Sequence, residues 1–156
     1  MHLLRQKWST VTLLPGLRKD HINKLQLAQN SAARLLTGTR KREHISPILR
    51  SLHWLPIPER IDFKLLLLTF KSLNDVAPPY MEELLVRYRP TRTLRSAAKG
   101  LLVQPNYNLK TYGYRAFSYA APKVWNSMLM SLRTCCELKA FKSKIKTFLF
   151  KRAFQL

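Results

Sequence analysis

The chain has 156 residues, a length that fits a single domain with its own hydrophobic core. Apolar residues make up 46% and charged residues 23%, which argues against a disordered chain, and only 4 Gly argue against flexible linkers. Lysine and arginine total 28 against 8 acidic residues, a net charge of +20. Such an excess repels itself unless a polyanion neutralises it, and nucleic acid is the commonest such partner, with an anionic membrane second.

The positive charge is concentrated in the C-terminal half. Residues 1–83 carry 13 basic and 7 acidic residues, a net charge of +6, whereas residues 84–156 carry 15 basic and 1 acidic, a net charge of +14. No acidic residue occurs between Leu84 and Cys136. Because solvated helix faces usually mix both signs, this absence predicts one strongly positive, anion-binding surface.

Cysteine usage and hydropathy indicate an intracellular setting, nuclear or cytoplasmic. The two cysteines, Cys135 and Cys136, are adjacent, and neighbours in sequence rarely bridge each other. No apolar run approaches the length of a membrane span. Residues 1–19 resemble a transit peptide only weakly, since Pro15-Gly16 interrupts any helix there, and we expect them to be a poorly ordered extension.

The first predicted helix covers residues 21–36, with Asp20 as its N-cap and Gly38 just beyond its end. Its apolar side chains recur every three or four positions, which places them on one stripe. The small neighbours Ala32 and Ala33 would let a partner helix approach closely. The stripe comprises Ile22, Leu25, Ala28, Ala32 and Leu35.

Prolines mark the starts of the next three predicted helices. Ser46-Pro47 begins a short helix that ends near residue 52. Pro58 opens the longest apolar element, residues 59–73, which is apolar on nearly all sides and is therefore predicted to be central. Asn74 ends it, and Pro78-Pro79 opens a shorter helix that reaches about residue 86.

The pattern changes after residue 88. Residues 100–105 and 111–117 are short and rich in aromatic and apolar side chains, which predicts a small β-hairpin. A helix over residues 118–126 follows despite Pro122. Thr134 and Glu137 match a capping box, which opens a last helix that runs to about residue 152. Its apolar face comprises Leu138, Phe141, Ile145, Phe148 and Leu149, and another face is basic.

These elements define the expected organisation of the chain. We predict a mainly α fold of about five to six helices with a small β-hairpin in the C-terminal half. One domain would span residues 20–156. It would consist of a helical part (20–87), a hairpin and basic linker part (88–127), and a C-terminal amphipathic helix (134–152).

The candidate nucleic-acid ligands are basic side chains, several of them beside aromatics. Aromatic faces can stack on unpaired bases while cations hold phosphates, and arginine presents a planar fork that matches phosphate. Phe117 and Trp125 are more simply explained as core residues, whereas the tyrosines suit either role. The candidates are Arg40, Lys41, Arg42, Arg87, Arg89, Arg92, Arg95, Lys99, Lys110, Tyr112, Tyr114, Arg115, Lys123, Lys139, Lys142 and Lys146.

An ordered series of segments resembles the region that follows the palm domain in reverse transcriptases of Rex-type and related non-LTR (LINE-type) retrotransposons. The clearest are INKLQLAQNSAARLL at residues 22–36 and KTYGYRAFSYAAPKVWNS at residues 110–127. No single motif is decisive, but the order of the whole series is specific. The other matching segments are residues 51–56, 60–74, 94–96, 100–103 and 140–149.

The resemblance implies a parent enzyme that copies RNA at a nicked target site, of which this chain holds only the part after the palm. Its expected partners are RNA or an RNA/DNA hybrid, and the upstream palm domain where that is present. Such a region would brace the duplex that leaves the palm or hold the template RNA, mostly through phosphate contacts.

The chemistry of polymerisation is not expected in this chain. Reverse transcription needs carboxylates that hold two metal ions, and the family supplies them from adjacent palm aspartates. Here Asp20, Asp62 and Asp75 each stand alone, and the histidines lack ligand spacing. Glu59 lies one turn before Asp62, but both fall in a first helical turn, where the helix dipole favours acids. We therefore expect no enzymatic activity, no metal site and no cofactor.

Two other functions remain open at the level of sequence. The chain could be a retrotransposon remnant with only a structural role, whose helices pack on the palm and leave apolar surface exposed without it. Alternatively, the basic last helix could lie on a membrane or fit a partner's groove. The residues Lys139, Lys142 and Lys146 suit this reading as well as RNA binding.

Overall fold

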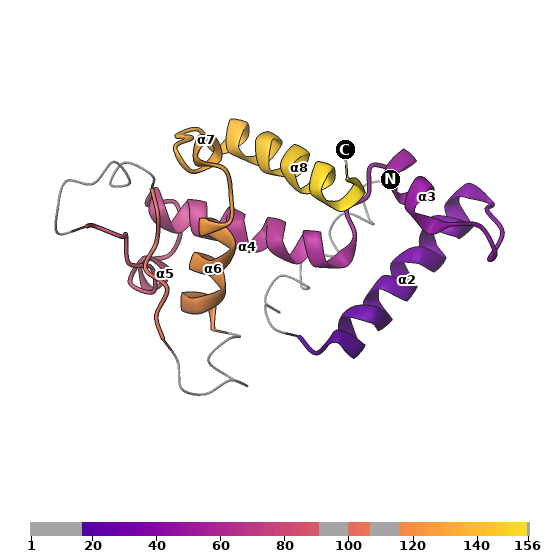
Figure 1. The fold of residues 1–156 in the computed structure, drawn as a ribbon, viewed down its shortest axis with the longest axis horizontal. Helices are drawn as coiled ribbons and strands as arrows, with labels where there is room; N and C mark the ends of the chain where they lie inside the picture. The colour runs from indigo at the N-terminus through magenta and orange to yellow at the C-terminus, as the bar shows by residue number, and fades with distance from the viewer. Residues whose placement is uncertain (1–16, 91–99, 107–115, 156) are drawn as a thin grey trace.

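A computed structural model describes residues 17–90, 100–106 and 116–155 of the chain. Within these ranges the protein is mainly helical, which confirms the predicted fold class (Figure 1). No helix of the described ranges is long and apolar enough to cross a membrane. In chain order the helices are α2 (Lys19–Thr37), α3 (Ile45–Ser51), α4 (Ile57–Leu73), α5 (Pro79–Glu82), α6 (Phe117–Asn126), α7 (Met130–Arg133) and α8 (Leu138–Phe154).

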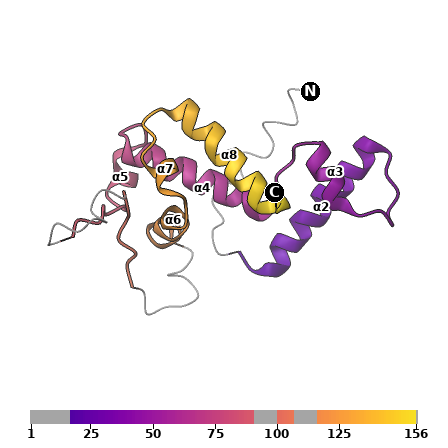
Figure 2. The same cartoon turned by 45° about the horizontal axis from the view of Figure 1, so that its top comes forward.

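Helix α4 is the centre of the fold, as its apolar sequence predicts. Helices α6 and α8 both pack on it, and α2 and α5 contact it as well. Helix α8 runs antiparallel alongside α4 (Figures 1 and 2), because Phe141 near its start stacks on Phe70 near the end of α4, with ring centroids 4.2 Å apart. The main core comprises Leu65, Leu66, Phe70, Leu85, Leu102, Ala120, Ala121, Trp125, Met128, Leu132, Phe141 and Ile145.

The N-terminal helices form a separate arm at the start of α4. Helices α2 and α3 pack on each other beyond that end of α4 and lie far from α5 and α7 in both views (Figures 1 and 2). Gly38 ends α2 with a left-handed φ of 66°, and its N–H bonds to the carbonyl of Arg34, as the sequence predicts. The short helix predicted from Ser46-Pro47 is α3, which begins one residue earlier.

The buried face of α2 differs from the predicted stripe. Ala28 and Leu35 are exposed, whereas Gln29 and Ala33 are buried. The reason is polar: the Gln29 amide donates a 2.8 Å hydrogen bond to the carbonyl of Leu55. The amide of Gln29 and the small side chain of Ala33 therefore occupy the buried positions that the apolar stripe assigned to Ala28 and Leu35.

Two predicted helix caps are wrong. Asp20 lies inside the first turn of α2, whose N-cap is Arg18, and it forms an exposed ion pair with Arg18 at 3.4 Å. The capping box is also absent, since Glu137 itself is the N-cap of α8 and makes no side-chain cap bond. The hydroxyl of Thr134 instead donates to the carbonyl of Met130 (3.2 Å), because the unpredicted helix α7 ends there.

The predicted β-hairpin is not confirmed. Its second arm, residues 111–117, lies mainly outside the described residues, and Phe117 already belongs to α6. The first arm pairs elsewhere, since Leu102 forms an antiparallel bridge with Arg87. Helix α5 is also shorter than predicted and ends at Glu82, whereas the predicted helix over residues 118–126 is present as α6, with Pro122 inside it.

Candidate nucleic-acid interface

The outer surface of α8 is the most basic helical face that the structure describes. Phe141, Ile145 and Leu149 point to the core and are fully buried. No acidic residue occurs inside the helix, and its lysines are exposed and form no ion pair with any described residue. At 100° per residue they fall into two rows. The first row is Lys139, Lys142 and Lys146, and the second is Lys144 and Lys151.

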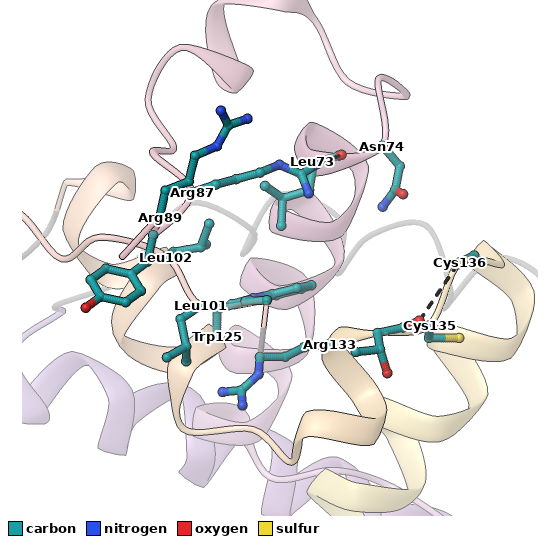
Figure 3. A pocket seen from close by; sticks show the side chains of 13 residues that line it. Leu73, Asn74, Arg87, Arg89, Leu101, Leu102, Trp125, Arg133, Cys135 and Cys136 are labelled. Carbon is teal, nitrogen blue, oxygen red and sulfur yellow. Dashed lines mark hydrogen bonds between the residues drawn. The ribbon is translucent and has the colours of Figure 1, made fainter. Parts of the chain in front are cut away.

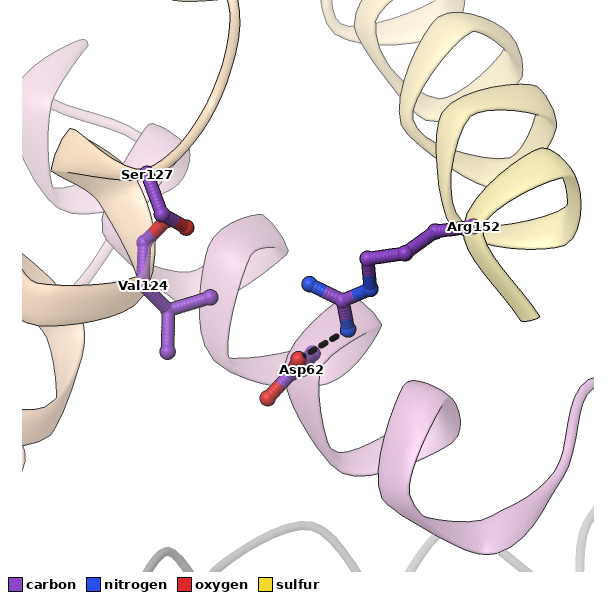
Figure 4. A network of polar contacts seen from close by, with 4 residues as sticks. All are labelled: Asp62, Val124, Ser127 and Arg152. Atoms are coloured by element: carbon purple, nitrogen blue, oxygen red, sulfur yellow. Dashed lines mark hydrogen bonds and ion pairs between the residues drawn. The ribbon is translucent and has the colours of Figure 1, made fainter. Parts of the chain in front are cut away.

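Arg152 does not belong to this free surface. It forms an ion pair with Asp62 near the start of α4 (Figure 4). Glu59 lies one turn earlier on α4, and burial raises the pKa of its carboxyl above 4.5, while the positive charge of Arg152 partly opposes this rise. The acids of α4 thus neutralise one cation of α8 and leave the lysines without a protein partner among the described residues.

Arg40, Lys41 and Arg42 lie on an ordered turn between α2 and α3. The carboxylate of Glu43 accepts from the backbone N–H of Arg40 (3.4 Å), and the guanidinium of Arg34 donates to the carbonyl of Glu43 (3.0 Å). All three basic side chains are exposed. This connector lies at the opposite end of the molecule from α5 and α7 (Figures 1 and 2), so it forms a cluster of its own.

A two-sided clasp holds residues 100–103 in place beside α6. The side chain of Asn126 accepts from the N–H of Leu102 (3.0 Å) and donates to the carbonyl of the same residue (2.8 Å). The indole N–H of Trp125 donates to the carbonyl of Gly100 (2.9 Å), and this glycine has a left-handed φ of 58°. On the other side, the N–H of Tyr88 bonds to the carbonyl of Leu101 (2.9 Å). The extended segments are therefore fixed without a regular sheet.

A cavity of about 440 Å³, here called the arginine cavity, opens between these segments and the loop before α8 (Figure 3). No acidic residue is among the described residues that line it. The side chain of Arg87 reaches the carbonyl of Leu73, whereas the side chain of Arg89 runs in a different direction and has no hydrogen bond or ion pair with any described residue. The lining residues are Leu73, Asn74, Arg87, Tyr88, Arg89, Gly100, Leu101, Leu102, Trp125, Arg133, Thr134, Cys135 and Cys136.

Arg133 is the lining cation that the sequence does not single out. One of its guanidinium nitrogens, Nη1, donates to the carbonyl of Asn126 (2.9 Å), while its buried Nε has no hydrogen-bond partner among the described residues. Desolvation lowers its pKa below the ordinary value of an arginine, although an arginine keeps its charge at any physiological pH. It stands alone between Leu132 and Thr134, so the only sequence signal was its place in the acid-free stretch from Leu84 to Cys136.

The remaining predicted ligands divide into those that the structure places and those that it does not describe. Lys123 is exposed on α6. Trp125 is 2% exposed and Phe117 packs partly buried against the core, as expected for packing residues. The predicted ligands that lie outside the described residues are Arg92, Arg95, Lys99, Lys110, Tyr112, Tyr114 and Arg115.

The structure thus places Arg87, Arg89 and Arg133 in the lining of one cavity, and it aligns three lysines along α8. The loop of Cys135 and Cys136 joins the two, because it lines the arginine cavity and leads directly into α8. Within the described residues no three His, Cys, Asp or Glu side chains gather in a way that could hold a metal ion. Comparisons with protein-family models, with curated proteins and with solved structures gave no match.

Proposed function

We propose that the chain is a non-catalytic module that binds RNA or primer–template through phosphate contacts, as the post-palm region of a LINE-type reverse transcriptase would. The observation that carries the proposal is the outer face of α8. Its lysines are exposed and lack ion pairs among the described residues, while every buried position of the helix is apolar. A row of unneutralised cations on a rigid element is suited to successive phosphates and carries no preference for base sequence.

The fold favours nucleic acid over a membrane as the partner of α8. A helix that lies in a membrane interface inserts its apolar face among the lipids. Here Phe141, Ile145 and Leu149 are fully buried in the core, so they would have to leave it first. Lysines that face solvent from a docked helix can contact phosphates without any such rearrangement.

The second candidate function, packing on an upstream palm domain, is supported by the exposed apolar surface of α2. Leu27, Leu35 and Leu36 are 65%, 85% and 58% exposed. Large apolar side chains exposed along one helix are candidates for an interaction surface. Both functions are compatible, because α2 and the lysine rows of α8 lie on different elements.

Fluorescence anisotropy of a labelled RNA, titrated with the purified chain across a salt series, tests the proposed function. If about five phosphates are neutralised, log K falls with log salt at a slope of about −3.5 for a single strand and about −4.5 for a B-form duplex. The proposal predicts micromolar or tighter binding with a slope steeper than about −3. Absence of binding at low salt by the folded chain would contradict it and would favour the structural role.

A further inference from the structure

The arginine cavity has the size and the chemistry of a site for one nucleotide. Its volume of about 440 Å³ lies in the range of roughly 300–1,000 Å³ that is typical of small-ligand pockets. A nucleic-acid duplex is larger than this cavity, because its minor and major grooves alone are about 6 and 12 Å wide. The cavity can therefore take a single extruded or unpaired nucleotide, while the lysine rows of α8 can contact any phosphate backbone.

The lining supplies separate groups for a phosphate and for a base. Arg87 and Arg89 contribute two positive charges, and no acidic side chain lines the cavity to neutralise them. Tyr88 is 42% exposed, so its ring is accessible for stacking. Trp125 is 2% exposed and its indole N–H is already bonded to Gly100, which leaves Tyr88 as the accessible aromatic of this lining.

We propose that the arginine cavity binds one unpaired nucleotide of a single-stranded nucleic acid, with its phosphate on Arg87 and Arg89 and its base against Tyr88. This inference rests on the proposed function and deepens it. The α8 lysines supply affinity for any nucleic acid, and the cavity adds a preference for single strands. The preference follows because a base in a duplex is stacked and paired and does not reach the tyrosine.

The two cysteines of the chain give a direct readout of occupancy. The sequence contains no other cysteine, both line the cavity, and both are free thiols, with Cys136 exposed. Their alkylation by a maleimide would be followed by mass spectrometry with the intact protein at saturating RNA. We expect a single-stranded decanucleotide to slow alkylation at least about fivefold, and a hairpin duplex with the same number of phosphates to slow it far less. Equal protection by both RNAs, or by neither, would overturn the proposal.

Substitution of the aromatic group tests the same site independently. Tyr88→Ala should weaken single-strand affinity about fivefold or more, the effect of one lost base–aromatic stack, and should leave duplex affinity unchanged. Tyr88→Phe keeps the ring and should retain the affinity, which guards against a folding defect. The matched control is Tyr80→Ala, because Tyr80 is 65% exposed on α5 and does not line the cavity.

The outcomes separate the two proposals. If the native chain binds neither RNA, the proposed function fails, and the cavity assignment fails with it. A second outcome is that the native chain binds both RNAs while Tyr88→Ala lowers both affinities equally or lowers neither affinity. In either case the cavity does not hold a base, but the phosphate-binding function stands. Loss confined to the single strand supports the site.

Discussion

The side-chain amide of Gln29 on α2 donates a buried 2.8 Å hydrogen bond to the backbone carbonyl of Leu55, just before α4 begins. Its neighbour Gln26, one turn earlier, accepts from the N–H of Ile57 at 2.8 Å. Gln26 thereby satisfies an N–H of the first turn of α4, which has no partner within that helix, and Gln29 shares the Leu55 carbonyl with the guanidinium of Arg60. They fix the N-terminal arm, and with it the turn of Arg40, Lys41 and Arg42, relative to the central helix.

Removal of this amide should loosen the arm. Gln29 is 1% exposed, so Gln29→Ala leaves the Leu55 carbonyl with one partner fewer and a small void, and should lower the free energy of unfolding by about 1–3 kcal/mol. Urea unfolding monitored by circular dichroism measures this change. Ser31→Ala, on the exposed side of the same helix, should change it by less than about 0.5 kcal/mol. Equal effects of both substitutions would contradict the assigned contact.

Glu59 should make the stability of the fold depend on pH. Burial raises the pKa of its carboxyl above 4.5, so the folded chain binds this proton more tightly than the unfolded chain does. The stability that protonated Glu59 contributes to the fold is therefore fully present below pH 4.5. It is lost as the pH rises through the higher pKa of the folded chain. Glu59→Gln should stabilise the chain at neutral pH relative to the native chain and should remove this part of the pH dependence.

The measurement is the free energy of unfolding of both chains between pH 4 and 7. The difference between Glu59→Gln and the native chain should grow with pH and then level off. A difference that is constant with pH, or that shrinks as pH rises, would contradict a raised pKa. Glu83→Gln is the control, because Glu83 is exposed on the loop after α5.

Asn126 should be needed for the position of residues 100–103. It makes both hydrogen bonds of the clasp on Leu102, whose side chain is 3% exposed. Asn126→Ala leaves the N–H and the carbonyl of Leu102 without this partner and should cost about 2–4 kcal/mol of unfolding free energy. Ser127→Ala, one residue later and exposed, should have little effect. A loss below about 0.5 kcal/mol for Asn126→Ala would show that the clasp is dispensable.

Arg152 should contribute to the stability of the fold and Lys146 to RNA binding, although both are basic residues of α8. Arg152 pairs with Asp62 and is 39% exposed, so Arg152→Gln should lower the free energy of unfolding by at most about 1 kcal/mol. It also removes a charge that holds down the pKa of Glu59, which should therefore rise further. Lys146→Gln should instead leave stability unchanged and weaken RNA binding. The reverse pattern would contradict the division of α8 into a paired and a free part.

The central helix could be predicted because one property decides its place. Residues 59–73 are apolar on nearly all sides, and only the interior of the fold can accommodate such a helix. The end of α2 could be predicted as well, because Gly38 readily adopts the left-handed conformation that ends a helix. Both features depend on local sequence alone.

The errors arose where a contact outside the predicted element decides the outcome. Gln29 appears polar in sequence, yet its position is set by a carbonyl 26 residues away. Thr134 matches a capping residue, but the short helix α7 ends at that point, and the hydroxyl bonds back to Met130 instead. The partner of Gln29 lies outside any local window of sequence, whereas the partner of Thr134 is only four residues away and was missed because α7 was not predicted.

The candidate site could be predicted only in part. Arg87 and Arg89 stood out as closely spaced cations, and the lysines of α8 followed from helical periodicity. The arginine cavity could not be predicted, because its walls come from five separate stretches of chain, and the bonds of Trp125 and Asn126 hold one of them, residues 100–102, in place. Arg133 joins them only through that tertiary arrangement.

The most direct test of the central claim compares the two rows of lysines on α8. Two double variants are compared: one combines Lys142→Gln with Lys146→Gln, and the other combines Lys144→Gln with Lys151→Gln. Both remove the same charge from the same helix, and all four residues are exposed. If the first row contacts phosphates, its loss should weaken single-stranded RNA binding and make the salt slope shallower by about 1.4. The second pair lies on the other flank of the buried face of α8, out of reach of a strand that follows the first row, and should change the slope by less than about 0.5. Indistinguishable slopes for the two variants and the native chain would contradict phosphate binding along α8.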